Sequence, residues 1–201
     1  MALFTPLLLL AFITVAAGDP DIITDFIAPA DPASINGSFF TYTGFRNLPG
    51  SNATTLKVTK ATLGEFPALE GQSVSFAFLE FPPGAINPPH THPRGSELLF
   101  LLHGTLEVTV IDTKNTPYTQ RLQSGDMFVF PKGLVHLQYN RNHKQGAIAV
   151  SAFGSVNAAT VSVPNSVFAT GIDDVILAKA FKTDVATIQK IKAGLNSPIH
   201  A

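Results

Sequence analysis

Three histidines and one glutamate have the residue types and the spacing of a metal-ligand set. His90 and His92 occupy alternate positions of a proline-rich segment, Glu97 follows five residues after His92, and His136 lies in a second apolar stretch. Alternate residues of an extended segment point to the same face, so the two histidines can meet at one ion. Neutral imidazoles and an ionised carboxylate suit a divalent first-row metal. These donors predict a single metal site and by themselves leave manganese, iron, nickel, zinc and copper open.

The segments that must position these donors have the pattern of an all-β protein. Short apolar, β-branched or aromatic runs recur between glycine and proline turns, which is typical of a sandwich or barrel. Gly104 is expected at a bend, and Gly125 and Gly133 at turns that need a positive φ. Strands are expected at 39–42, 56–61, 73–81, 98–111, 120–122, 127–131, 135–139 and 147–153.

The pattern changes to helical spacing after Pro164. Residues 173–181 and 184–192 predict two short amphipathic helices, with Asp173 and Asp184 suited to cap their first turns. Each helix has one apolar face that needs a partner. The residues expected on these faces are Val175, Leu177, Ala178 and Phe181 in the first helix, and Val185, Ile188 and Ile191 in the second.

Residues 1–18 have the composition of a secretory signal peptide. Their apolar core ends in small residues, so cleavage is expected between Gly18 and Asp19. The apolar run is too short for a membrane anchor. Residues 19–201 are then a single domain, with a barrel core at about 60–165 and a helical part at about 172–194. Secretion would make the sequons at Asn36 and Asn52 usable for glycosylation.

Composition narrows the classes of partner. The formal net charge is -1 and no basic run is present, so neither nucleic acid nor an anionic membrane is an expected partner. Charged residues make up 13% of the chain, compared with about 25% in typical soluble domains. This low charge indicates that other subunits cover part of the surface. Cysteine is absent, so a secreted chain of this kind must rely on its core, its oligomer or its metal.

The two stretches that carry the donors resemble the paired motifs of the cupins, specifically of the plant germins and germin-like proteins. Residues 84–104 read as glycine, five residues, HxH, four residues, glutamate, six residues, glycine. Residues 125–140 read as glycine, five residues, PxG, two residues, histidine, three residues, asparagine. Every anchor of both motifs is present. The resemblance implies an all-β jelly-roll barrel with an extended N-terminal arm and short C-terminal helices.

The same resemblance implies a manganese ion held by His90, His92, Glu97 and His136, with two coordination positions left open for water or substrate. It also implies a secreted protein of the plant cell wall or apoplast with a defence or stress role. Germins assemble as hexamers, built as trimers of dimers, in which C-terminal helices clasp neighbouring subunits. A homo-oligomer of this type is therefore expected here.

The resemblance also bears on activity. Germins that oxidise oxalate hold it with two asparagines near the metal; Asn87 matches one of them, and Ala77 stands where the other is expected. Losing one donor costs on the order of 1–3 kcal/mol, so oxalate oxidation is not expected. Superoxide dismutation, with a small anionic or O2-derived substrate, is the favoured activity. The alternative is a non-catalytic wall protein that binds a small ligand, as auxin-binding relatives do. Asn87 and Asn140 are the candidate pocket residues.

The chain departs from most germins at its N-terminus. Ile27 and Phe40 stand where the family has a disulfide, and they are expected to bury against each other in a divergent, cysteine-free branch. Of the remaining histidines, His143 and His200 are expected on the surface, and His103, at the strand bend before Gly104, is not expected to touch the site. The aromatic residues near the second motif are expected in the core rather than as a substrate platform; these are Phe128, Phe130 and Tyr139.

Overall fold

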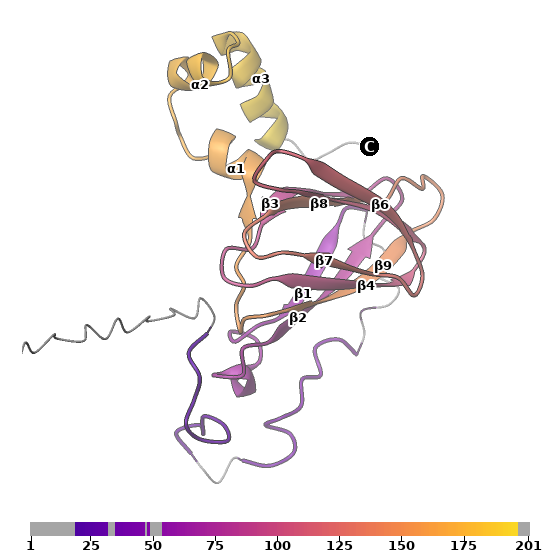
Figure 1. Ribbon diagram of the computed structural model, residues 1–201, viewed down its shortest axis with the longest axis vertical. Coiled ribbons are helices and arrows are strands. Elements are labelled where there is room, and N and C mark those ends of the chain that lie inside the picture. Colours follow the sequence, from indigo (N-terminus) through magenta and orange to yellow (C-terminus); the bar gives the residue numbers. More distant parts are fainter. Residues whose placement is uncertain (1–18, 32–34, 47, 49–53, 197–201) are drawn as a thin grey trace, which may run out of the picture.

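The computed structural model describes residues 19–31, 35–46, 48 and 54–196, and these form two facing β-sheets with helices at one end (Figure 1). The expected signal peptide and Asn52 lie outside the described residues. A short 3-10 helix, η2 (Pro67–Leu69), follows the first strand. The strands are β1 (Lys57–Ala61), β2 (Ser75–Phe81), β3 (Ile86–Thr91), β4 (Glu97–His103), β5 (Thr105–Ile111), β6 (Pro117–Gln123), β7 (Met127–Phe130), β8 (Val135–Tyr139), β9 (Ala147–Phe153) and β10 (Val161–Ser162).

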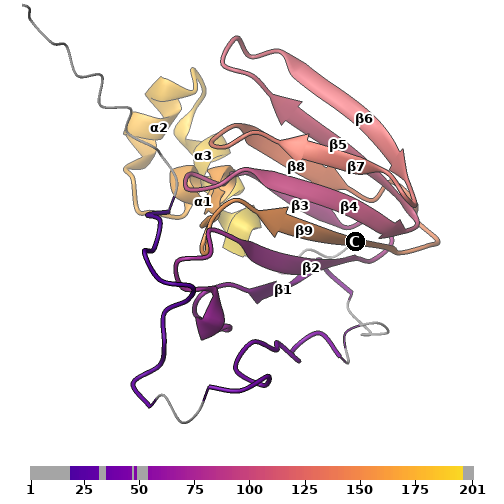
Figure 2. The ribbon, with the colours of Figure 1, turned by 60° about the horizontal axis from the view of Figure 1, so that its bottom comes forward.

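Each sheet has five strands, and all neighbouring strands are antiparallel. One sheet has the order β1-β2-β9-β4-β7 and the other has β10-β3-β8-β5-β6 (Figure 2). Strands that are adjacent in a sheet are therefore often far apart in the chain. The expected all-β cupin architecture is confirmed as a two-sheet sandwich followed by helices.

The core lies between the sheets and follows the alternation of each strand. On β4, Leu99 and Leu101 are fully buried, whereas Leu98 and Leu102 are exposed on the outer face. Fully burying a leucine stabilises a fold by about 1.5–3 kcal/mol, so this alternation determines which face turns inward. The other fully or almost fully buried apolar residues between the sheets include Phe81, Leu106, Val108, Phe130, Ala147 and Ala149.

Most expected strands are confirmed, but the one expected at 39–42 is wrong. The amide of Phe39 donates to the carbonyl of Asn36 at 3.0 Å, and the amide of Thr41 donates to that of Ser38 at 3.1 Å. The Asn36 side chain also accepts from the Ser38 amide at 2.8 Å. These turn hydrogen bonds engage backbone groups that a strand would use, so local turn chemistry outweighs the aromatic pair.

The expected mutual burial of Ile27 and Phe40 is also wrong. Their exposed fractions are 37% and 48%. Phe40 instead packs edge to face against two other rings, with centroid distances of 5.1 Å to Phe26 and 4.9 Å to Phe39. An aromatic cluster therefore joins the two parts of the arm where a contact between Ile27 and Phe40 was expected.

Three helices, α1 (Val163–Phe168), α2 (Asp174–Ala180) and α3 (Val185–Asn196), stand beyond one end of the sandwich (Figure 1). The caps are confirmed, because Asp173 accepts from the Val175 amide at 2.9 Å and Asp184 from the Thr187 amide at 2.8 Å. The sequence pattern did not predict β10 or the helix α1 that follows it directly. Among the described residues, the helices are too short or too polar to cross a bilayer.

The helices bury only part of the apolar faces expected for them. Leu177 and Ala178 of α2 pack with Ile188 of α3 in a small core of their own. Val175 and Phe181 were expected on the same face, but their exposed fractions are 64% and 53%. The described residues thus leave part of the apolar surface of α2 and α3 uncovered.

Gly104 joins β4 to β5 at a φ of +83° and is predicted to tolerate no side chain. A Cβ there would lie 2.7 Å from the Gly146 carbonyl oxygen. We expect Gly104→Ala to lower the free energy of unfolding by about 3 kcal/mol, combining backbone strain with overpacking. Gly125 also has a positive φ, but a Cβ there meets open space. Gly125→Ala should therefore lower the free energy of unfolding by only about 1–2 kcal/mol. If denaturant unfolding gave equal losses for the two variants, the close approach of the Gly146 carbonyl to Gly104 would not affect stability.

Candidate metal centre

The four predicted ligands come together because strands of both sheets converge on one point. His90 on β3 lies directly opposite His136 on β8 in the antiparallel register. His92 follows β3, and Glu97 opens β4 in the facing sheet. One ligand atom from each of the four residues lies within 4.8 Å of the others, and all four residues are buried. The structure thus places the whole predicted set at a single site between the sheets.

Backbone carbonyls fix the orientation of all three imidazoles. The Nδ1–H of His90 donates to the Pro88 carbonyl at 2.8 Å, and that of His136 donates to the Leu134 carbonyl at 2.9 Å. The Nδ1–H of His92 donates to the carbonyl of Ala159. A proton held at Nδ1 leaves the lone pair of Nε2 free, which is the arrangement of histidines that bind metals.

Glu97 completes the set with a charged carboxylate. Its Oε2 lies 3.0 Å from Nε2 of His92 and 3.2 Å from Nε2 of His136, and its Oε1 accepts from the Ser151 hydroxyl at 2.6 Å. Burial raises the pKa of Glu97, but contacts with His136, His92 and Ser151 outweigh burial and lower this pKa to about 2. The carboxylate is therefore ionised at neutral pH.

The donor set fits a divalent cation. Burial lowers the pKa of His90 to about 4, and the neighbouring His136 acts in the same direction, so the His90 imidazole is neutral at pH 7. When each imidazole keeps its proton at Nδ1, its Nε2 lone pair faces the other donors and the carboxylate. Such groups repel at these distances unless a cation lies among them. Nitrogen and oxygen donors of this kind suit a first-row metal.

Two aromatic rings hold the imidazole planes. Phe130 stacks on His136 with centroids 4.3 Å apart and an angle of 20°. Phe153 meets His92 edge on, with centroids 4.9 Å apart. Phe130 is almost fully buried, which agrees with its predicted place in the core. These rings shield the site from water and restrict the rotation of two ligands.

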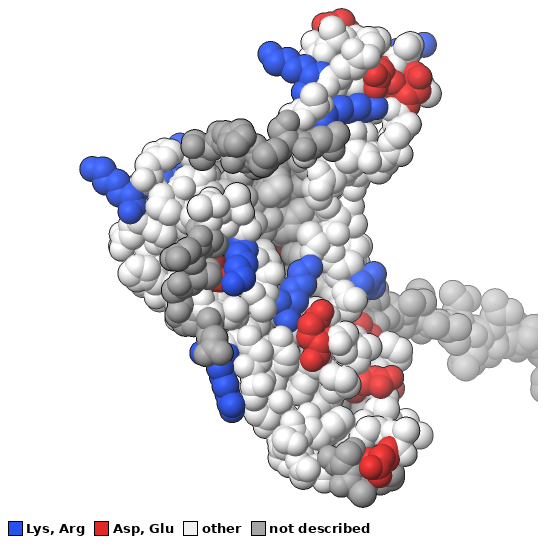
Figure 3. Space-filling model, turned by 180° about the vertical axis from the view of Figure 1, so that it is seen from behind, with Lys and Arg blue, Asp and Glu red and all other residues white. Residues whose placement is uncertain are grey.

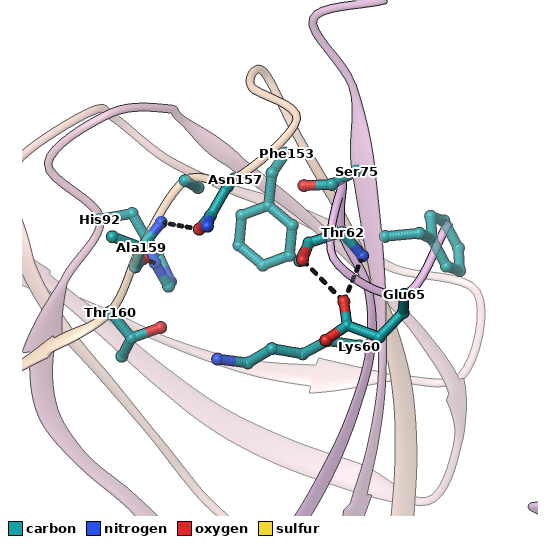
Figure 4. A pocket seen from close by; sticks show the side chains of 11 residues that line it. Lys60, Thr62, Glu65, Ser75, His92, Phe153, Asn157, Ala159 and Thr160 are labelled. Carbon is teal, nitrogen blue, oxygen red and sulfur yellow. Dashed lines mark hydrogen bonds between the residues drawn. The ribbon is translucent and has the colours of Figure 1, made fainter. Parts of the chain in front are cut away.

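Two adjoining cavities lead to the site. The inner one has a volume of about 110 Å³ and is lined by His90, His92 and Glu97, together with Val58, Lys60, Ala77, Leu79, Asn87, Phe153 and Thr160. The outer one has a volume of about 230 Å³ and shares Lys60, His92, Phe153 and Thr160 with the inner one (Figure 4). Ala77 and Asn87, the positions compared with the oxalate-binding asparagines, both face the inner cavity.

The other candidate residues lie elsewhere. Asn140 was expected in the pocket, but its side-chain amide lies 2.9–3.1 Å from the carbonyls of Phe81, Pro82 and Gln145, and it lines neither cavity. Its observed contacts tie together three turns, and this corrects the expectation of a pocket role. His143 is exposed, as expected, and His103 is exposed and lines neither cavity. Asn36 is exposed, and His200 lies outside the described residues.

Sequence reasoning missed several polar residues around the centre. Gln138 lies directly opposite Asn87, is fully buried, and its side-chain amide has no hydrogen-bond partner among the described residues. Its even spacing from His136 was an available signal, since residues two apart on a strand share a face. Ser151 interrupts the apolar run of β9, which was a weaker signal. No sequence signal pointed to Lys60, because only the pairing of β1 with β2 brings this residue to the cavities.

The N-terminal arm braces the loop beside His92. The carboxylate of Asp19 accepts from the Ser155 hydroxyl at 2.9 Å and from the Val156 amide at 2.6 Å. Four residues beyond Ser155, Ala159 provides the carbonyl that orients His92. Asp19 therefore supports one metal ligand through a loop 136 residues away in the chain.

Residues 45–189 match the Cupin family. Together, the sandwich and the His3Glu set define a metal-binding cupin. Germin-like protein 9-3 of Oryza sativa subsp. japonica is 58% identical over 195 residues, covering 92% of this chain and 89% of that relative. Nectarin-1 of Nicotiana plumbaginifolia is 38% identical over 192 residues, covering 88% and 83%. The chain belongs to the germin-like proteins of the cupin family.

A solved structure supports the same assignment. Oxalate oxidase in complex with the substrate analogue glycolate superposes with a TM-score of 0.79 at 27% identity, covering 89% of this chain and 98% of that one. The shared architecture therefore extends beyond the barrel to most of the chain.

Removing one imidazole should abolish metal retention. We expect purified wild-type protein to carry about one metal ion per subunit and His136→Ala to carry almost none, because loss of a direct ligand exceeds the 10–100-fold loss typical of outer contacts. His103→Ala removes an exposed imidazole and should retain a full complement. Elemental analysis after dialysis measures both, and a fully loaded His136→Ala protein would show that this residue is not a ligand.

Proposed function

We propose that this germin-like protein is a manganese enzyme that removes superoxide. The observation that carries the proposal is a three-histidine, one-carboxylate set beside a cavity of only about 110 Å³. That volume equals three to four water molecules at roughly 30 Å³ each. Such a space suits a diatomic anion. A bound manganese ion would supply one-electron redox chemistry by alternating between two oxidation states.

The protein's own residues hold and shield this chemistry. His90, His92, Glu97 and His136 would bind the ion, while the carbonyls at Nδ1 and the Ser151 hydroxyl keep the donors in position. Asn87, which lines the cavity, supplies an amide donor for a small anion. The overall reaction converts two superoxide ions and two protons to dioxygen and hydrogen peroxide, so it needs no further reductant.

Ala77 argues against oxalate as the substrate. Its methyl group faces the cavity and offers no hydrogen bond to a carboxylate. The resemblance to oxalate-oxidising germins places a substrate-binding asparagine here, and losing a neutral donor costs on the order of 1–3 kcal/mol. Superoxide is smaller and carries one charge, so it does not require this second amide.

A non-catalytic binding role is the alternative, and one cavity favours it. A hollow of about 270 Å³ is lined mainly by apolar and aromatic side chains, including Tyr42, Phe45, Phe66 and Val74. Its size and lining suit a small aromatic ligand of the kind bound by auxin-binding relatives. This hollow lies away from the four metal donors, so ligand binding there would not need the metal.

We further propose a secreted homo-oligomer of the apoplast or cell wall, with glycans at Asn36 and Asn52 and a role in defence or stress. Charged side chains are sparse on the face seen in Figure 3. Large apolar residues are exposed on the outer face of one sheet and on α2; these are Leu98, Leu102, Met127, Val129, Val175 and Ile176. Such surfaces support burial between subunits, and the resemblance to germins suggests a hexamer built as a trimer of dimers.

Assays of two substrates test the proposed activity. The metal-loaded wild-type protein should remove superoxide and release little hydrogen peroxide from oxalate. Ala77→Asn should gain about ten- to a hundredfold in oxalate turnover, because it restores one donor. Rapid oxalate oxidation by the wild type would show that Ala77 does not limit the substrate. Failure of fully loaded protein to remove superoxide would favour the binding role.

Light scattering and N-terminal sequencing test the assembly and secretion. We expect an oligomer of six subunits at micromolar concentration and a mature chain that begins at Asp19. Val129→Glu places a charge on the exposed sheet face and should shift the mass towards smaller species if that face is an interface. A monomeric wild type, or a secreted chain beginning at Met1, would contradict the respective proposal.

A further inference from the structure

The β1–β2 register aims Lys60 at the cavities beside the metal centre. Lys60 lies directly opposite Ala77, and Val58 lies directly opposite Leu79. Residues directly opposite in an antiparallel pair extend from the same face of the sheet. Ala77 and Leu79 belong to the buried interior, so Lys60 extends from that face too. Lys57, which lies opposite Glu80, extends from the other face.

Lys60 brings a positive charge that nothing nearby in the described chain neutralises by direct contact. It is the only lysine or arginine among the residues lining either cavity, and it lines both. Among the described residues, its ammonium group has no ion pair within 4.0 Å, whereas Lys57 lies 3.6 Å from a Glu80 oxygen. Figure 4 shows the Lys60 side chain extended across the outer cavity with its ammonium end towards Thr160.

Each cavity also holds one carboxylate: Glu65 in the outer cavity and the metal ligand Glu97 in the inner one. The Oε2 of Glu65 accepts from the Thr62 amide at 2.9 Å and from the Thr62 hydroxyl at 2.6 Å, so the carboxylate is held in place. An entering anion therefore meets both signs of charge in the outer cavity. In the inner cavity a bound metal ion would offset the charge of Glu97, and Lys60 supplies a further positive charge.

The small side chain of Ala77 leaves space where Lys60 could meet a ligand. A larger residue directly opposite Lys60 would occupy the wall that the two share. The inner cavity of about 110 Å³ then adjoins a cation on one side and the metal donors on the other. A volume of this size suits small anions.

We propose that Lys60 forms an anion-binding position at the wall shared by the two cavities and that it draws small, singly charged anions to the metal centre. The inference rests on the proposed function only in taking that centre as the anion's destination. Lys60 acts as a positioning and selectivity residue, and its ligands are linear or planar anions of two to three heavy atoms. A positive wall raises the local concentration of such ions and hence their rate of arrival.

Azide, a small singly charged anion, is the probe for this position. Calorimetric titration of the metal-loaded protein at low ionic strength should give an azide dissociation constant that rises about three- to thirtyfold in Lys60→Gln, as expected for the loss of one nearby charge. Lys57→Gln makes the same charge change on the other face of the strand and should leave this constant unchanged. Metal content should match the wild type in both variants, and the melting temperature should match it in Lys60→Gln.

Two further measurements sharpen the test. Glu65→Gln removes the opposing charge and should tighten azide binding. Added salt should weaken azide binding by the wild type more than by Lys60→Gln, since the Debye length falls to about 10 Å at 0.1 M. Equal azide constants in wild type and Lys60→Gln, or no measurable azide binding by the wild type, would overturn the inference.

Parallel superoxide assays separate this inference from the proposed function. Lys60-dependent azide binding in a protein that does not remove superoxide would support the anion position and refute the proposed activity. Superoxide removal that is equally fast in wild type and Lys60→Gln at low salt, together with equal azide constants, would refute the anion position and leave the activity standing.

Discussion

Four lone-pair donors converge between two sheets, and the rest of the structure depends on keeping them there. Three imidazole nitrogens and an ionised carboxylate oxygen lie within 4.8 Å of one another, and a cation among them would stabilise this arrangement. The fold sustains this arrangement by directing each Nδ1–H to a backbone carbonyl and one Glu97 oxygen to Ser151. The carbonyl groups are fixed by the strands and turns themselves, so the geometry does not rely on mobile side chains.

A bound ion would also connect the two layers. Glu97 belongs to the β1-β2-β9-β4-β7 sheet, whereas His90 and His136 belong to the other. The chain has no cysteine and thus no disulfide to join its layers. Binding at a hundred times the dissociation constant would stabilise the folded state by about 2.7 kcal/mol. Metal binding can therefore supply stability that many disulfide-bonded domains obtain from covalent cross-links.

The sequence predicted the metal ligands. It did not predict the site residues that reach the centre only through the pairing of strands far apart in the chain. His90, His92 and Glu97 lie within eight residues and carry their own proline and glycine context, so local reasoning suffices for them. Ser151 and Lys60 reach the site only through the registers of β9 and β1, which no local pattern encodes. Gln138 could have been found from its parity with His136.

Two errors have a different cause, namely competition from local hydrogen bonds. The aromatic residues at 39–42 favoured a strand, but Asn36 and Ser38 close a turn there. Asn140 matched a motif anchor and so suggested the pocket. Its side-chain amide instead donates hydrogen bonds to three backbone carbonyls, and this role depends on how the turns lie in three dimensions.

The contact between Asp19 and Ser155 has a consequence for the order of events during synthesis. Asp19 leaves the ribosome early, whereas Ser155 follows 136 residues later. At roughly 5–20 residues per second, the arm waits about 7–27 seconds for the loop that it will brace. The carbonyl partner of His92 at Ala159 arrives later still, after both histidine-bearing strands exist. The fully oriented ligand set is thus a late product of folding, and a nascent barrel that meets metal early must hold it with His92 not yet fixed.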